Sequence, residues 1–211
     1  MSEKERYAAV LGWFEENMPV AETELHYENT YQLLVAVILS AQCTDKRVNM
    51  ITPALFDAFP TVEAMAAADV DDIYRYIKSV TYPNNKARNL LAMAKMVTEV
   101  YGGVVPENLE ELLKIPGVGR KTANVIMAVA YNKPAMAVDT HVFRVSERIG
   151  LTTGSKTPLQ TEQVLTANIP QSILGKAHHW LILHGRYICK ARKPECLDCG
   201  LKSYCRYYSK N

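Results

Sequence analysis

Apolar residues recur three and four positions apart along most of this chain, which is the spacing of one face of an α-helix. The pattern predicts helices over residues 2–18, 31–41 and 45–59, and a later helix that ends at Gly102-Gly103. Apolar and polar residues do not alternate as they would in a half-buried strand, and the chain carries no β-hairpin signature. We therefore predict an all-α protein with about ten short helices.

Residues that can cap a helix mark where several of these elements begin. Thr30 can cap the helix predicted over 31–41, and Asn108 forms a capping pair with Glu111. Thr157 and Gln160 have the spacing of a capping box. Each of these side chains would satisfy a backbone N–H group that the first turn of a helix leaves without a partner.

The composition of the chain changes this picture little. Of 211 residues, 48% are hydrophobic and 22% are charged, which is typical of a soluble globular protein and excludes a disordered or fibrous chain. The long apolar run near the front covers only residues 33–39, far short of the ~20 residues that a membrane span needs. The charged opening, Met1 to Arg6, is unlike a signal peptide. We expect a cytoplasmic protein that does not enter a membrane.

The charge of the chain is unevenly distributed. The net charge is +2, but residues 176–211 hold eight basic against two acidic side chains, whereas residues 1–175 hold sixteen basic and twenty acidic ones. A basic segment on a slightly acidic body is typical of a protein with one face directed at a polyanion, and nucleic acid is the commonest polyanion. Exposed lysines are also ordinary surface, so charge alone leaves this open.

Four of the five cysteines, Cys189, Cys196, Cys199 and Cys205, fall within 17 residues near the end of the chain. In a reducing compartment such a cluster indicates a metal site and not a set of disulfides. Four thiolates suit either tetrahedral zinc or a four-iron, four-sulfur cluster. The spacing matches neither a zinc knuckle with two Cys-x-x-Cys pairs nor a ferredoxin, so both metals remain open at this point.

Residues 112–126 predict two helices joined by a tight turn that contains Gly117 and Gly119. Glycines allow positive φ angles and let a ligand approach the backbone closely. The N–H groups of Gly117, Val118, Gly119 and Arg120, with the positive end of the second helix, would then bind a DNA phosphate without recognising sequence. The alternative is a plain helix–turn–helix connection, but the apolar flanks favour the phosphate-binding hairpin.

Lys121 and Asp139, which both follow this turn in the sequence, are candidates for catalysis. Lys121 would lie at the start of the second helix, where the helix dipole and Arg120 both disfavour its ammonium form, and an uncharged lysine is a nucleophile. A lysine that only contacts phosphate is at least as common. Asp139 precedes a helical pattern and is suited to cap it, although a second carboxylate oxygen would still be able to act in a cleft.

These motifs together resemble the endonuclease III family of the helix-hairpin-helix DNA glycosylase superfamily. The resemblance rests on Leu-x-x-Ile-Pro-Gly-Val-Gly-Arg-Lys-Thr-Ala-Asn at 112–124, on Val-Asp-Thr-His-Val-x-Arg-Val at 138–145, and on the terminal cysteines. It also includes residues 39–45 and 178–186, and it covers roughly residues 30–205. Several independent motifs in the right order make the resemblance highly specific.

The resemblance implies a fold of two α-helical domains with an active-site cleft between them. One domain would be a six-helix body over residues 22–131 that contains the hairpin. The other would combine residues 1–21 with 132–211 and hold the iron–sulfur cluster. Lys121 and Asp139 match the family's catalytic residues and would face each other across the cleft.

The resemblance also implies a bifunctional enzyme of base excision repair that removes oxidised pyrimidines and cleaves abasic sites as a lyase. We expect a monomer that binds double-stranded DNA carrying damaged pyrimidines or abasic sites. Gln42 matches the residue that fills the space left by the flipped nucleotide. The loop around Tyr82 is a second candidate wedge, where this chain departs from the aliphatic residue common in the family.

The family's cluster ligands match all four terminal cysteines, which decides the metal question in favour of a 4Fe-4S cluster. Lys190, Arg192 and Lys193 lie between the first two ligands, so a loop anchored at both ends would hold three cations toward DNA phosphates.

Two other functions stay in view. An adenine glycosylase of the same superfamily would lack the catalytic lysine and carry an acid on the early apolar helix. Here Lys121 is present, and residues 33–39 contain no acid. A non-catalytic iron–sulfur DNA-binding protein would use the hairpin and the metal alone.

Overall fold

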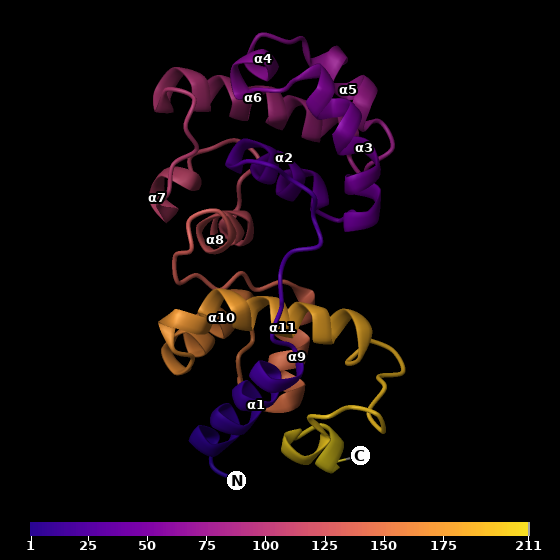
Figure 1. The fold of residues 1–211 in the computed structure, drawn as a ribbon, viewed down its shortest axis with the longest axis vertical. Helices are drawn as coiled ribbons and strands as arrows, with labels where there is room; N and C mark the ends of the chain where they lie inside the picture. Colours follow the sequence, from indigo (N-terminus) through magenta and orange to yellow (C-terminus); the bar gives the residue numbers. More distant parts are fainter. Residues whose placement is uncertain (211) are drawn as a thin grey trace. The chain divides into compact units, whose positions relative to one another are not determined.

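The computed structural model describes residues 1–210. Its regular elements are eleven α-helices and three short 3₁₀-helices, with no strand in this range, which confirms the all-α prediction (Figure 1). No helix among these residues is long and apolar enough to cross a membrane. The chain forms two compact units: a central unit, Glu24–Tyr131, and a terminal unit, Met1–Thr23 together with the chain from Asn132 on. The boundaries expected from sequence, after residues 21 and 131, lie within two residues of these.

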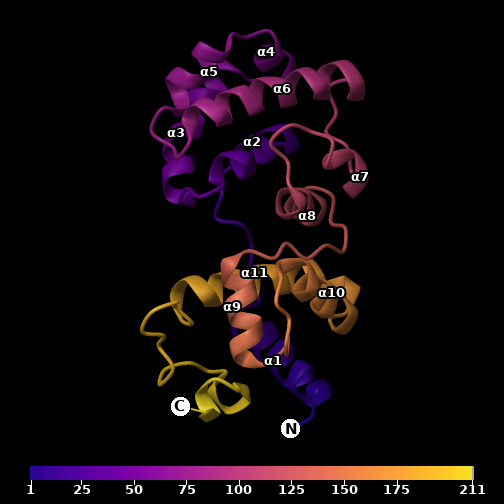
Figure 2. The same ribbon diagram turned by 180° about the vertical axis from the view of Figure 1, so that it is seen from behind.

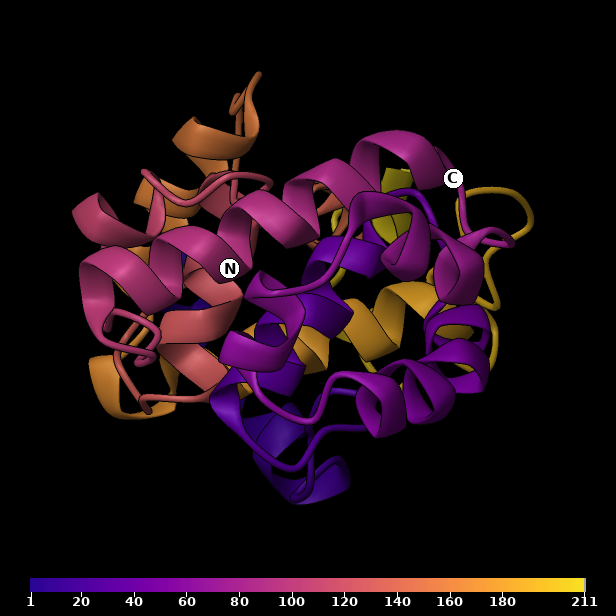
Figure 3. The same cartoon turned by 90° about the horizontal axis from the view of Figure 1, so that it is seen from above.

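The central unit is built around one buried helix. Its helices are α2 (Thr30–Ser40), α3 (Asp45–Ala58), α4 (Val62–Ala66), α5 (Val70–Ile77), α6 (Pro83–Tyr101), α7 (Leu109–Leu112) and α8 (Arg120–Val129). Residues 31–39 of α2 are all buried, and α2 contacts α3, α6 and α8. The long α6 packs against α4 and α5 (Figures 2 and 3). This apolar packing fixes the positions of α8 and of the turns at both ends of α2 and α6.

The terminal unit joins the two ends of the chain. Its helices are α1 (Glu3–Asn17), α9 (Thr140–Ile149), α10 (Pro158–Asn168) and α11 (Leu174–Tyr187), with 3₁₀ turns at Gln171–Ile173, Lys202–Tyr204 and Tyr208–Lys210. The rings of Phe14 and Trp180 stack with their centroids 5.5 Å apart, and Trp180 Nε1 donates to Met18 O at 2.8 Å. The first helix is therefore part of the core around α9 and α11.

Glycine allows the close packing of α9 on α11. An added Cβ at Gly185 of α11 would lie 2.8 Å from His141 Cβ and 3.0 Å from Val145 Cγ2, both on α9. Such contacts are closer than a carbon atom tolerates, so the two helices approach to this distance only because residue 185 has no side chain.

The residues that cap the helix N-termini are those predicted from sequence, except at α2. The side chains of Asn108 and Thr157 accept from the backbone three residues later. The N-cap of α2, however, is Asn29, whose side chain accepts from Gln32 N at 3.0 Å. The prediction of Thr30 was wrong by one residue because both neighbours are good capping residues.

Candidate functional site

The predicted hairpin is present in the central unit. Helix α7 ends in a turn that leads into α8, and Val118 N donates to Ile115 O at 3.0 Å across the turn. Leu112, Ile115 and Val118 are buried, whereas Gly117 and Gly119 are exposed. The apolar side chains therefore hold the turn against the core while its glycine backbone faces outward.

The two glycines of this turn differ in what they do. Gly117 has φ +82°, and an added Cβ there would lie 3.0 Å from Asn89 Cβ. Gly119 does not use the positive φ that glycine allows: its φ is −91°, and nothing lies within 4 Å of an added Cβ. The protein itself does not require glycine at position 119, so its missing side chain leaves the start of α8 open to a ligand.

The α8 N-terminus presents backbone and cations together. Gly119 is its N-cap, and no side chain among the described residues caps it. Arg120 and Lys121 are exposed on the first turn, whereas Ala123 and Ile126 are buried. The apolar face thus fixes the helix, and the amine of Lys121 is accessible on the opposite side. The Val118 side chain is buried, so this residue has only its backbone to offer a ligand.

Asp139 caps α9 in the terminal unit, as predicted. Its Oδ1 accepts from the N–H groups of His141 and Val142, both at 2.8 Å. Its Oδ2 lies 3.0 Å from His141 Nδ1, and the Asp139 side chain is 15% exposed. Sequence reasoning missed His141, although a histidine two residues after a capping aspartate is placed to reach its second oxygen.

Gln42 and Tyr82 both lie in exposed turns of the central unit. Their φ angles are +54° and +53°, the left-handed region that non-glycine residues rarely adopt. The Tyr82 side chain is 62% exposed. Both residues are therefore held outward on strained backbone. Such strain persists only where the surrounding structure imposes it, and it occurs most often at functional sites.

The four terminal cysteines line one cavity in the terminal unit. The space between protein atoms is about 350 Å³, partly open to solvent, and His184, Ile149 and Leu201 also line it. All five cysteines of the chain carry free thiols. Contacts from outside the cysteine segment reach three of these sulfurs: Arg148 Nη1 lies 3.6 Å from Cys189 Sγ, Cys205 Sγ donates to Arg148 O at 3.4 Å, and His184 Nε2 lies 3.6 Å from Cys199 Sγ.

The chemistry of these donors fits a group that binds thiolates. Burial raises the pKa of Cys199, and the other three cysteines raise it further. Burial, Cys189 and Cys205 likewise raise the pKa of Cys196. Thiols whose ionisation is opposed in this way become stable thiolates when a cationic centre is bound beside them. Among residues 1–210, no three His, Cys, Asp or Glu side chains lie close enough together to bind one metal ion.

His184 is a neutral neighbour of this cavity. Burial lowers the pKa of His184 to about 4, and its ring packs edge-on against Phe14 with centroids 5.6 Å apart. This environment is that of a core histidine and not of an acid–base catalyst.

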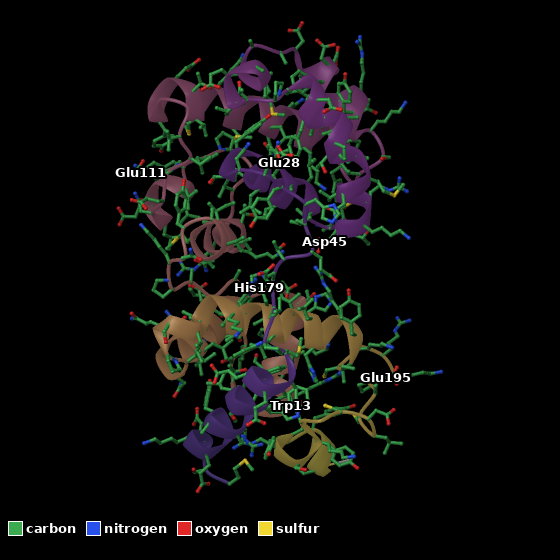
Figure 4. The ribbon with its side chains drawn as sticks, in the orientation of Figure 1. Trp13, Glu28, Asp45, Glu111, His179 and Glu195 are labelled. Atoms are coloured by element: carbon green, nitrogen blue, oxygen red, sulfur yellow. The ribbon has the colours of Figure 1, made fainter. Side chains whose placement is uncertain are left out.

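The basic loop between the first two cysteines is anchored by a residue that sequence reasoning missed. Arg148 of α9 donates from Nη1 to Lys190 O at 2.8 Å and from Nη2 to Ala191 O at 3.1 Å. Arg192 and Lys193 are exposed. Lys190 is exposed as well, but its Nζ pairs with Glu195 Oε1 at 2.7 Å (Glu195 is labelled in Figure 4).

Comparison with known proteins gives consistent matches. Residues 35–171 match the model of the HhH-GPD superfamily base excision DNA repair proteins. Endonuclease III of Rickettsia felis is 50% identical over 196 residues, which is 93% of this chain and 92% of the relative. Two solved structures superpose with TM-scores of 0.94 at 41% identity: a trapped covalent intermediate of endonuclease III with DNA, an estranged-adenine complex, and a non-covalent endonuclease III–DNA complex. They align over 100% of this chain and over 99% and 98% of theirs.

Proposed function

This chain belongs to the endonuclease III family of the HhH-GPD superfamily of base excision DNA repair proteins, and from that premise we propose that it excises oxidised pyrimidines from double-stranded DNA and then cleaves the strand 3′ to the abasic site. The enzyme is a DNA glycosylase and an AP lyase. The observation that carries the finer proposal is the exposed Lys121 on the first turn of α8, directly after an open glycine turn.

Lys121 is the proposed nucleophile. Its uncharged Nζ attacks C1′ of the damaged nucleoside, the glycosidic bond breaks, and the base leaves with the bonding electrons and takes up a proton. Opening of the sugar ring then gives a Schiff base between Nζ and C1′. The iminium acidifies the C2′ proton, and its removal expels the 3′ phosphate by β-elimination. Hydrolysis of the Schiff base returns the free lysine.

Asp139 is the proposed partner of Lys121 in this chemistry. Its carboxylate would stabilise the positive charge that grows on the sugar and assist proton transfer. The support for this role is the geometry of its two oxygens: Oδ1 is taken by two cap bonds, and His141 orients Oδ2. That Lys121 and Asp139 act on one nucleotide is part of the proposal.

The DNA contacts are proposed from exposure and charge. The backbone of Gly117, Val118 and Gly119, with the start of α8 and Arg120, would bind a phosphate. Gln42 would occupy the space left by the flipped nucleotide, whose extrusion costs a few kcal/mol that a damaged base partly offsets. The exposed cations of the loop at 190–193 would bind further phosphates.

Cys189, Cys196, Cys199 and Cys205 would hold a 4Fe-4S cluster, and the cavity that they share supports this assignment. When bound, such a cluster would cross-link the two ends of this segment through the four thiolates. The protein's own contribution is Arg148, whose guanidinium donates to the carbonyls of Lys190 and Ala191 in the loop between the first two cysteines. Protein that is yellow-brown and contains about four irons per chain would agree with this assignment, whereas colourless protein with stoichiometric zinc would contradict it.

We further propose that the protein acts as a monomer in the bacterial cytoplasm, associated with the nucleoid. The bacterial origin of its relatives supports this location.

The proposed function is tested by trapping with borohydride. Wild-type protein should form a covalent complex with a duplex that contains an oxidised pyrimidine, because reduction fixes the Schiff base. Lys121→Ala should lose both trapping and strand cleavage and still bind DNA, since phosphate contacts come from the backbone and from other cations. Lys95→Ala, an exposed lysine of α6, is the matched control. Trapping by Lys121→Ala would place the nucleophile elsewhere. Release of adenine from a mispair with an oxidised base, without trapping on the oxidised pyrimidine, would favour an adenine glycosylase. The absence of base release and of trapping would favour a non-catalytic protein.

Asp139→Asn separates capping from catalysis. Asn caps a helix as well as Asp does, so α9 and the melting temperature should be retained. Excision should slow by about 10²–10⁴-fold, the usual contribution of a positioned acid or base. Single-turnover kinetics with unchanged DNA affinity would establish the effect. A fully active variant would show that Asp139 is only a cap.

A further inference from the structure

Lys86 of α6 is a buried lysine whose contacts are unusual. Its side chain is 6% exposed. Nζ donates to Leu39 O at 2.9 Å, to Ala41 O at 2.7 Å and to Thr81 Oγ1 at 3.3 Å. Lysine is almost never buried without partners that use its charge, and burial lowers the pKa of Lys86. These hydrogen bonds are what keeps a long charged side chain inside the central unit.

Two of the three contacts, Ala41 and Thr81, lie in the two exposed left-handed turns, and the third, Leu39, lies directly before one of them. We name residues 40–43, which follow the last turn of α2, the Gln42 turn. Leu39 is the residue before this turn, and Ala41 is the residue before Gln42. Thr81 immediately precedes Tyr82 in the Tyr82 turn (residues 80–83). A second bond links the turns directly, since Thr81 Oγ1 donates to Gln42 O at 2.7 Å. The backbone of Lys86 also forms the first hydrogen bond of α6, since its amide N–H donates to Tyr82 O at 3.1 Å.

We propose that Lys86 is a positioning residue that joins the Gln42 turn and the Tyr82 turn into one rigid double wedge, so that both side chains enter the DNA duplex together. This inference rests on the proposed function, which requires a nucleotide to leave the base stack. Gln42 would fill the vacated space while Tyr82 separates the neighbouring base pair. The double wedge acts on the cost of opening the duplex and takes no part in bond breaking.

If Lys86 only stabilised the fold, its hydrogen bonds would go to the core and to the end of α2 alone. The end of a helix leaves carbonyl groups that a cation can satisfy, and Lys86 does this for Leu39 and Ala41. The hydroxyl of Thr81, however, belongs to a separate, exposed segment, and its strongest bond goes to Gln42, not to the core. Helices α2 and α6 are in contact, and each carries fully buried apolar residues, such as Leu34 on α2 and Leu90 on α6. The polar link therefore fixes the two turns and not the fold.

The test compares reactions that need the double wedge with one that does not. Lys86→Met keeps the length of the side chain and removes the three bonds, and Lys95→Met, on the exposed side of the same helix, is the control. Single-turnover excision of an oxidised pyrimidine is measured on a duplex, and strand cleavage is measured on a single-stranded oligonucleotide with an abasic site. A 2-aminopurine next to the lesion reports opening of the duplex.

Lys86→Met should lower the single-turnover rate on the duplex by about tenfold to a hundredfold with little change in DNA affinity, since small misplacements have effects of this size. The 2-aminopurine signal should fall in parallel, and single-strand cleavage should be unchanged. Thr81→Val should reproduce the defect and Thr81→Ser should restore activity. These exposed-residue variants test the same link if Lys86→Met does not fold.

Equal losses on duplex and single strand, or a normal duplex rate in both Lys86→Met and Thr81→Val, would overturn the proposal. A wild-type protein that neither excises nor traps would instead overturn the proposed function, so the two failures are distinguishable.

Discussion

The hairpin at residues 109–129 and the cysteine segment at residues 189–205 are held in place in opposite ways. The hairpin rests on buried apolar side chains from its own sequence, including Leu112, Ile115 and Ile126. In the cysteine segment the buried apolar side chain is Leu201, and its regular structure is one 3₁₀ turn at Lys202–Tyr204. The hairpin is therefore a product of the hydrophobic effect, whereas the cysteine segment depends on polar contacts and on its thiols.

The contacts of the cysteine segment come from distant parts of the terminal unit. Arg6 of α1 donates to the carbonyls of Ile149 and Tyr204, and Arg148 holds the carbonyls of Lys190 and Ala191. An added Cβ at Gly200 would collide with the ring of Trp13, which Figure 4 labels on α1. Arg6, Arg148 and the ring of Trp13 thus hold the cysteine segment in place, as buried apolar side chains hold the hairpin. A bound metal group would add a further link.

The largest effect that separates the two regions should come from loss of a thiolate ligand. Cys205→Ser should remove iron and destabilise the terminal unit by several kcal/mol, because metal binding and folding of a metal site are coupled. Hydrogen exchange should show lost protection at 189–205 and unchanged protection at 109–129. Cys43→Ser, a cysteine outside the cavity, is the control. Equal loss of protection in both regions would show that the two are one cooperative unit.

Local sequence predicted the parts of the molecule that local sequence determines. Helix ends and caps such as Asn108 and Asp139 depend on neighbours within four residues, and these predictions agree with the structure. The error at Thr30 has the same origin, since Asn29 and Thr30 are both capping residues and only the path of the chain selects between them. The hairpin was recognisable for a related reason: its buried residues and its glycines lie within one continuous stretch.

The residues that were missed act across long distances in the sequence. Arg148 meets Lys190 O across 42 positions, and Lys86 meets Leu39 O across 47. No periodicity or spacing connects such pairs before the fold is known. The pair of Lys190 and Glu195 is different, because opposite charges five residues apart in one anchored loop could have been anticipated.

A smaller effect should distinguish the two glycines of the hairpin. Gly117→Ala should cost about 1–2 kcal/mol of stability, since a side chain at φ +82° is strained, and its Cβ would also press on Asn89. Gly119→Ala should cost less, at most about 1 kcal/mol, because φ is ordinary and the space is open, and the remaining cost is that alanine is a poorer N-cap than glycine. DNA affinity should nevertheless fall. Denaturation and binding isotherms on both variants test this, and unchanged affinity in Gly119→Ala would show that no phosphate approaches the turn.

The smallest expected effect is on DNA binding by Lys190, Arg192 and Lys193 of the cysteine segment, which differ in whether an acidic residue already pairs with them. Arg192 and Lys193 are exposed, whereas Lys190 is engaged by Glu195 at 2.7 Å, and this ion pair lowers the pKa of Glu195. Each cation that contacts a phosphate contributes about 0.9 to the slope of log K against log salt. Arg192→Ala and Lys193→Ala should each reduce the slope by up to that amount, and Lys190→Ala by less.

Glu195→Gln should sharpen this contrast, because it removes the carboxylate and releases Lys190 toward the DNA. The variant should bind DNA more tightly at low salt and show a steeper slope. Adding Lys190→Ala to Glu195→Gln should abolish the gain, since the added contact depends on that amine. Titration of labelled duplex at several salt concentrations measures all of these slopes. If Lys190→Ala flattens the slope as much as Arg192→Ala does, the ion pair opens on binding, and the loop presents three equivalent cations to the phosphates.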